Sequence, residues 1–80
     1  MILLLMNNTI LITEIEEVSA DIGEPDCKLI NPYVVESDLS LNPWLTNLTK
    51  NNELMMNSDK ILTIIEPKKT LLDTYLELTQ

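Results

Sequence analysis

The segment that most constrains the fold of this 80-residue chain is residues 53–67, which reads ELMMNSDKILTIIEP. Two apolar runs flank a short polar turn, and Pro67 ends the second run because proline has no amide hydrogen to give to a sheet. The second run, ILTII at 61–65, places apolar side chains on both faces of a strand, since successive residues point to opposite sides. Both faces therefore need cover, and an uncovered edge strand of this kind promotes aggregation.

The length of the chain limits how much cover it can supply itself. A chain of 80 residues buries only roughly 60–65% of its extended surface on folding, so its own core is marginal. An economical solution is for one copy to pair an edge strand with the next copy, a head-to-tail contact that forms a ring if the rotation closes. We therefore expect the two apolar runs to form an interface between copies, through Leu54, Met55, Met56, Ile61, Leu62, Ile64 and Ile65.

The charge balance disfavours nonspecific binding to duplex nucleic acid. Thirteen Asp and Glu residues face five lysines, which gives a formal net charge of −8, and the chain contains neither Arg nor His. Binding to phosphate backbones depends on Lys and Arg releasing counterions, and without Arg no bidentate contact to a phosphate or a guanine edge is available. Any nucleic-acid ligand must therefore be bound despite a net repulsion.

The residue types argue against an enzyme. Without His, with a single cysteine and without a glycine-rich phosphate loop, nucleophilic and zinc mechanisms lack their usual groups. Six acids between residues 14 and 26 favour oxygen-binding cations in principle, but their spacing matches no calcium loop and indicates a solvated acidic edge. We expect no catalytic residue, no metal site and no cofactor.

The single cysteine and the apolar N-terminus bear on localisation. Cys27 has no partner for an intrachain disulfide, which favours a reducing cytoplasm and a role as a small buried side chain. The run MILLLM at 1–6 has no basic residue before it and is too short for a signal sequence or a membrane span. The pattern predicts a cytoplasmic protein without a membrane segment.

The pattern of apolar residues predicts a mainly β fold in one domain covering residues 1–80. We expect strands at about 2–6, 9–18, 27–36, part of 39–56 and 60–66, in a small, strongly bent, five-stranded antiparallel sheet or open barrel. The alternation in 9–18 slips by one residue, as a β-bulge would produce. A helix is the alternative for this segment, with Thr13 and Glu16 as a capping box. Pro32 must lie at an edge or a bulge.

The C-terminal segment changes to a helical period. Apolar residues at 71, 72, 75, 76 and 78 form one stripe, and no helix breaker follows. Thr70 is the best N-cap, because Lys68 and Lys69 would oppose the helix dipole. A C-terminal helix over about 70–79 follows, and packing on the protein's own sheet is its expected role, with docking in a partner's groove as the alternative.

The order of these elements resembles the Sm-like (LSm) fold of ring-forming RNA-binding proteins. LMM-NSDK-ILTIIEP resembles the second Sm motif, in which a small polar turn joins two apolar strands. Asp26-x-x-x-Ile30-Asn31, ahead of Tyr33, is similar to the first motif but has one residue too many. In length and in its terminal helix the whole chain resembles the small Sm-like proteins of marine phage, which would place it in a host cytoplasm.

The resemblance implies a homo-oligomeric ring that binds single-stranded RNA or DNA and takes part in nucleic-acid processing. It also implies that residues 21–26 and 57–60 line the pore of that ring. The candidate nucleic-acid-binding residues are Asn31 and Asn57 for base edges, Tyr33 for stacking, Lys60 for phosphate, and Ser58 and Lys28 beside them. The family's cation is missing, because Asn57, Ser58 and Asp59 occupy its place. The alternative is an assembly or adaptor module that binds a protein partner through its acidic face or terminal helix.

Overall fold

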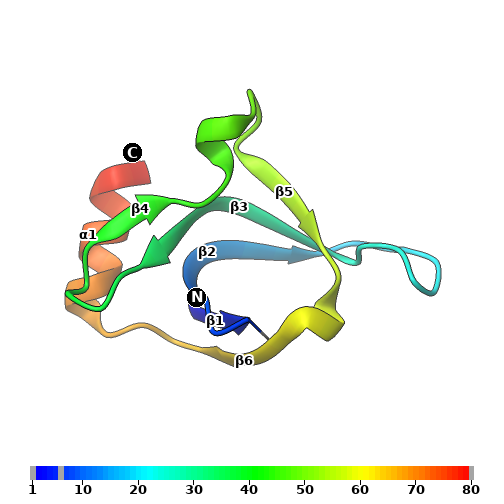
Figure 1. Ribbon diagram of the computed structural model, residues 1–80, viewed down its shortest axis with the longest axis horizontal. Helices are drawn as coiled ribbons and strands as arrows, with labels where there is room; N and C mark the ends of the chain where they lie inside the picture. Colours follow the sequence, from blue (N-terminus) through cyan, green and yellow to red (C-terminus); the bar gives the residue numbers. More distant parts are fainter. Residues whose placement is uncertain (1, 6, 80) are drawn as a thin grey trace.

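A single antiparallel sheet of six strands and one helix make up the computed structural model, which describes residues 2–5 and 7–79 (Figure 1). The strands are β1 (Ile2–Leu5), β2 (Ile10–Glu17), β3 (Cys27–Val35), β4 (Leu41–Pro43), β5 (Glu53–Met56) and β6 (Ile61–Ile65). The helix is α1 (Lys69–Thr79), and two 3-10 turns, η1 (Thr46–Leu48) and η2 (Ser58–Lys60), flank β5. The predicted mainly β, antiparallel fold with a C-terminal helix is confirmed, with six strands instead of five; Met6, expected in the first strand, lies outside the described residues.

The sheet has the strand order β4-β3-β2-β1-β6, and β5 pairs with the half of β3 that β4 leaves free. The apolar and β-branched composition of 10–17 gives a strand, so the helical alternative for this segment is wrong. Within the described residues β6 pairs only with β1 and β5 only with β3, so the sheet does not close into a barrel.

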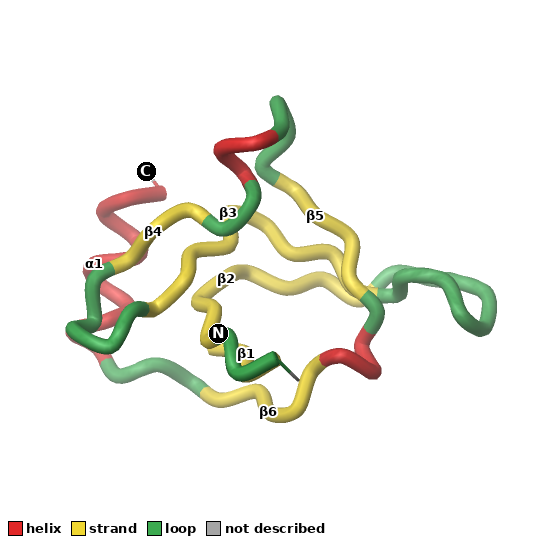
Figure 2. The backbone as a smooth tube through the Cα atoms, viewed as in Figure 1, coloured by secondary structure: helices red, strands yellow, loops and turns green. Residues whose placement is uncertain are grey.

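The segment 53–65 does not form a hairpin, although a short polar turn joins its two apolar runs. Between its two strands the chain makes the 3-10 turn η2, drawn as a short red segment in Figure 2. The Asn57 side chain accepts a hydrogen bond from the Asp59 amide, and the Lys60 amide donates to the Asn57 carbonyl at 3.1 Å. This helical turn separates β5 from β6, so each strand keeps an unpaired outer edge.

A bulge interrupts the pairing of β2 with β3, but the extra residue lies in β3. One residue, Thr13, separates the paired positions in β2, whereas Asn31 and Pro32 separate the corresponding positions in β3. Asn31 has a φ of 53°, a left-handed conformation that asparagine tolerates better than most residues. The prediction that Pro32 occupies a bulge is confirmed, while the bulge inferred for 9–18 belongs to its partner strand.

At this bulge β3 changes its outer neighbour. The Asn31 amide donates to the carbonyl of Asn52, just before β5, at 2.8 Å. The Pro32 carbonyl accepts from the amide of Trp44, just after β4, at 3.0 Å. One long strand therefore holds two short ones end to end, which bends the sheet.

The two faces of the sheet carry separate apolar clusters. The inner cluster contains the buried Leu11 and Leu29, against which Ile15, Val34, Trp44, Met56 and Ile61 pack. The helix-covered cluster contains the buried Ile2, Ile12 and Tyr75, against which Tyr33, Val35, Leu41, Leu71 and Leu72 pack. The helix therefore covers one face over β2, β3 and β4, and its expected packing on the protein's own sheet is confirmed for these residues.

The helix begins one residue earlier than predicted. The Leu72 amide donates to the Lys68 carbonyl at 3.0 Å, so Lys69 is already in the first turn and Thr70 is not the N-cap. Instead, the Thr70 carbonyl accepts a bond from the Thr74 hydroxyl at 3.1 Å. Packing of Leu71 and Leu72 on the sheet outweighs the unfavourable charge of a lysine in the first turn. No helix in the described part of the chain has the length and apolar character needed to cross a bilayer.

Candidate functional site

The edge strand β6 leaves large apolar side chains in solvent on both faces of the sheet. Leu62, Ile64 and Ile65 keep 57%, 51% and 52% of their surface exposed. Ile61 alone in this strand is half-buried, because it packs on the inner cluster. An apolar strand with a free backbone edge and exposed side chains is a surface suited to pairing with another strand.

Two grooves run along β6, one on each face. The first, of about 390 Å³, is lined on β6 by residues 61–64 and on the facing strands by Ile15, Glu17 and Cys27, with Ser58 at its rim. The second, of about 190 Å³, is lined by Ile2, Ile10, Thr63 and Ile65. Neither the rest of the sheet nor α1 fills these grooves, so β6 is incompletely covered on both sides.

The outer edge of β5 is also free, because among the described residues β5, like the short strand β4, pairs only with β3. Met55 keeps 52% of its surface exposed, whereas Leu54 and Met56 are half-buried. The turn η1, which precedes β5, contributes two further exposed apolar side chains, Leu48 and the N-cap residue Leu45, whose φ is 66°. The residues predicted to form an interface thus lie on two separate edges, one on β5 and one on β6.

A pair of hydrogen bonds joins the two loops that were predicted to lie together. The Asp26 carboxylate accepts from the Ser58 amide and from the Ser58 hydroxyl, both at 2.8 Å, across 32 residues of sequence. These bonds lower the pKa of Asp26, with the Ser58 amide as the largest cause. The loop 18–26 and the turn 57–60 are thereby fixed side by side, and we call them the loop rim.

The loop rim is acidic and carries an apolar tip. Asp21, Ile22, Glu24 and Asp59 are exposed, and Ile22 lies in the turn between Asp21 and Glu24. The loop 18–26 projects away from the sheet (Figure 1). Gly23 permits this turn with a φ of 89°, and the Glu24 amide donates to the Asp21 carbonyl. Within the described residues no three acids, cysteines or histidines converge to hold a metal ion.

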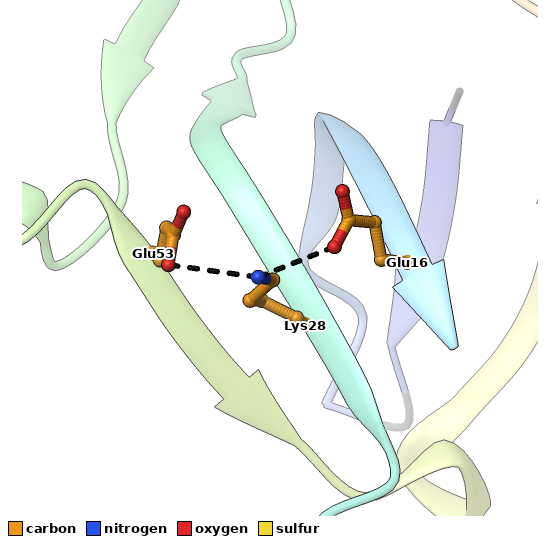
Figure 3. Close-up of polar contacts among 3 residues, drawn as sticks. All are labelled: Glu16, Lys28 and Glu53. Atoms are coloured by element: carbon orange, nitrogen blue, oxygen red, sulfur yellow. Dashed lines mark ion pairs between the residues drawn. The ribbon is translucent and has the colours of Figure 1, made fainter. Parts of the chain in front are cut away.

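The candidate cation Lys28 is neutralised by two carboxylates. Its ammonium lies 3.2 Å from Glu16 on β2 and 3.7 Å from Glu53 on β5, so the group bridges three neighbouring strands (Figure 3). The hydrogen bond and charge of Glu16, followed by the charge of Glu53, raise the pKa of Lys28. Lys28 therefore links β5 to β2 and β3 through ion pairs. Because both carboxylates compensate its charge, Lys28 is poorly suited to bind a phosphate.

Asn31 and Tyr33 also have structural contacts in the sheet. The Tyr75 hydroxyl on α1 lies 3.1 Å from the carbonyls of both Ile30 and Asn31, so its single hydrogen is shared at the bulge. The Tyr33 ring meets the Tyr75 ring edge-on, with centroids 5.9 Å apart and an interplanar angle of 86°. Burial raises the pKa of Tyr75. A base that stacked on Tyr33 would have to compete with this contact.

The structure therefore brings together only part of the predicted nucleic-acid site. Asn57, Ser58 and Lys60 lie in one turn, and Lys60 is exposed. Lys28 lies in the sheet between β2 and β5, and Asn31 and Tyr33 lie at the bulge under α1. Burial, followed by the charges of Asp26 and Glu17, raises the pKa of the Cys27 thiol, which favours its protonated form.

Two features of the site have no local signal in the sequence. The Tyr75 hydroxyl bonds to carbonyls that are 45 and 44 residues away in the sequence. The helical pattern of apolar residues predicts only that Tyr75 lies on the apolar face of the helix. The groove beside Ile10 is lined by Ile2, Ile10, Thr63 and Ile65, which come from three strands that are distant in the sequence.

Comparison with known sequences assigns the chain to a family without assigning an activity. The profile of a family described as a family of unknown function, DUF6561, matches residues 1–80, and the chain belongs to that family. No curated protein matches the chain.

Proposed function

We propose that this member of the DUF6561 family is an Sm-like assembly module, whose copies join edge to edge into a homo-oligomeric ring. The observation that carries the proposal is that β5 and β6 each leave one edge unpaired among the described residues, on opposite sides of one bent sheet. The short strand β4 also has a free edge, but its three residues include Pro43, which has no amide hydrogen to donate. Different patches at the two ends make a head-to-tail contact, which forms a ring where the rotation closes. The strand order and the η2 turn also support an Sm-like identity.

The apolar side chains at these edges supply the driving force. Complete burial of a Leu, Ile or Met side chain contributes about 1.5–3 kcal/mol. Four such side chains, Met55, Leu62, Ile64 and Ile65, are about half exposed, so their burial contributes roughly 3–6 kcal/mol to each contact. Backbone hydrogen bonds between the two edges add to this, because both edges are unpaired in the single chain.

The mass of the native protein tests the ring. Light scattering coupled to size exclusion is expected to give a multiple of the 9.1 kDa chain mass that does not change on moderate dilution. A particle of 9.1 kDa at all concentrations would rule out the ring. We place the assembly in the cytoplasm, the host's if a phage encodes it, because the single buried cysteine suits a reducing compartment.

Binding of single-stranded RNA or DNA at the loop rim is the second candidate function. It is favoured by the bonds between Asp26 and Ser58, which hold the turn with Asn57 and Lys60 against the loop 18–26. In a ring this rim repeats once per copy, so weak contacts add together. The surrounding carboxylates repel phosphate, which makes such binding weak and strongly dependent on salt.

Fluorescence anisotropy with short labelled oligonucleotides tests this second function. At low salt we expect U-rich or A-rich strands to raise the anisotropy, and we expect Lys60→Gln to reduce the affinity. Lys50→Gln is the matched control, because Lys50 is also exposed but lies outside the rim. If neither oligonucleotide binds, or if both variants lose the same affinity, the loop rim is not a nucleic-acid site.

The acidic rim also fits a protein partner with basic residues, which is the adaptor alternative. The terminal helix is poorly suited to this role, because Leu71, Leu72 and Tyr75 already pack on the sheet. Only Leu76 and Leu78 of its apolar stripe are exposed. An adaptor would therefore bind its partner through the rim.

A further inference from the structure

We propose that the inner groove, the first of the two grooves along β6, binds a small amphiphilic organic cation, with its ammonium group at Glu17 and its aliphatic chain against β6. The proposal does not depend on the ring, because one copy supplies every residue that lines this groove. The volume of about 390 Å³ falls in the range of roughly 300–1,000 Å³ that is typical of small-molecule sites.

The apolar wall of the inner groove comes from β6 and β2. Ile61, Leu62 and Ile64 line the groove on β6, and Ile15 lines it on β2. Ile15 and Ile61 are half-buried because they pack on the inner cluster, whereas Leu62 and Ile64 are more than half exposed. An aliphatic chain that lay along this wall would cover the exposed side chains, and binding gains free energy in proportion to the apolar area removed from water.

One end of the inner groove is negatively charged. Glu17 on β2 lies opposite Cys27 on β3, and both residues line the groove. Glu17 is exposed, and within the described part of the chain the ion pairs of the sheet involve Glu16 and Glu53 but not Glu17. Its carboxylate is therefore available for a charge-assisted hydrogen bond from an ammonium group.

A second carboxylate lies close to the same end of the groove. Asp26 precedes Cys27, and its carboxylate accepts bonds from the amide and the hydroxyl of Ser58, which lines the groove. The charges of Asp26 and Glu17 both act on the Cys27 thiol and contribute, after burial, to its raised pKa. Two negative charges therefore converge at this end, and they favour an ammonium group over a neutral one.

The neighbouring lysines do not neutralise the inner groove. Lys28 lies beside the charged end in sequence, but its ammonium pairs with Glu16 and Glu53. Lys60 in η2 is exposed, and it is not among the described residues that line the groove. The net charge of −8 also attracts cations and repels anions at longer range. The charges therefore select an aliphatic ammonium ion over an aliphatic carboxylate.

NMR titrations of the full chain test the site, with hexylammonium as the probe. We expect saturable shifts in the amide resonances of groove residues, among them Cys27, Ser58 and Thr63. Hexanoate, which has a similar chain and the opposite charge, should cause no saturable shift there. Methylammonium, which has the charge without the chain, should also fail to saturate these resonances. The proposal is overturned if hexylammonium gives no saturable shift, or if either control ion binds as tightly as hexylammonium does.

Glu17→Gln tests the contact with the ammonium group. Loss of one close charge pair corresponds to a fall in affinity of about fivefold or more, even where water surrounds the pair. Glu17 is exposed and glutamine has a similar shape, so the variant should retain the fold. Glu77→Gln is the matched control, because it removes the same charge from an exposed position of α1, which covers the other face of the sheet. Equal affinities of the two variants for hexylammonium would overturn the proposal.

Discussion

The helix-covered cluster and the β6 edge are both rich in Ile and Leu, yet the first is buried and the second is exposed. In the helix-covered cluster, Ile12 is fully buried and Tyr75 is 2% exposed, and the Tyr75 hydroxyl is bonded to the bulge. At the β6 edge, three apolar side chains remain more than half exposed. Within the described residues the one α-helix covers the sheet face around Tyr75 and leaves the β6 edge open, and the proposed ring assigns this open edge to a contact with another copy.

Truncation of Tyr75 should separate the two regions most clearly. Tyr75→Ala removes a buried aromatic ring and its hydrogen bonds, so we expect the free energy of unfolding to fall by about 3–5 kcal/mol. Chemical denaturation followed by circular dichroism measures this loss. Leu78→Ala, at an exposed position of the same helix, should cost less than about 1 kcal/mol. Similar losses in both variants would contradict a helix anchored through Tyr75.

Charges placed on the β6 edge should lower the native mass but change the fold of the single chain little. Leu62→Lys combined with Ile64→Lys changes the fold of the single chain little, because both side chains are already half exposed, but it blocks the edge. We expect the native mass to fall to that of one chain while the circular dichroism spectrum is retained. Leu39→Lys combined with Leu78→Lys, two exposed residues away from β5 and β6, should leave the mass unchanged. A mass that persists in the edge variant would place the contact elsewhere.

Much of this comparison could not be read from the sequence. Apolar composition placed β1, β2, β3 and β6 to within one or two residues, because strand composition is a local property, but it gave β4 and β5 only as part of one segment, 39–56. It did not show that β5 and β6 avoid each other, since the sequence NSDK fits both a hairpin and a helical turn. It also assigned the slip near Thr13 to the wrong strand, because a register depends on both partners.

For the site, the resemblance placed the two loops together, and the Asp26–Ser58 bonds agree with this. The structural contacts of Lys28 and Tyr33 depend on strands and a helix that are distant in the sequence.

Alkaline pH should destabilise the helix-covered cluster because Tyr75 ionises. Burial raises the pKa of Tyr75 above its ordinary value of 10.0, so the folded state favours the protonated phenol. This contribution is fully present below pH 10.0 and is lost as the pH rises through the raised pKa of the folded state. The free energy of unfolding should therefore fall more steeply above that pH in the native chain than in Tyr75→Phe. Parallel pH profiles of the two proteins would contradict this role.

At neutral pH, Tyr75→Phe should cost about 0.5–1.5 kcal/mol, the contribution of a typical hydrogen bond. The Ile30 carbonyl keeps a bond from the Thr13 hydroxyl at 3.0 Å, which limits the loss. Cys27 and Lys28 also titrate at alkaline pH, but they are present in both proteins, so the difference between the two profiles isolates Tyr75.

The smallest expected effect concerns the loop rim. Asp26→Ala removes both acceptors of Ser58, so the Ser58 amide should exchange its hydrogen several-fold faster, while the global stability changes little because the site is exposed. Hydrogen exchange followed by NMR measures this rate. Asp21→Ala, an exposed acid in the same loop without a described side-chain bond to the turn, is the control. Unchanged exchange in Asp26→Ala would show that the two loops are held by other contacts.

The native mass of the unmodified chain tests the central claim most directly, because the free edges of β5 and β6 are the basis of the proposed ring. Light scattering should give a discrete multiple of 9.1 kDa that is stable to dilution. A single mass of 9.1 kDa at all concentrations would contradict the account.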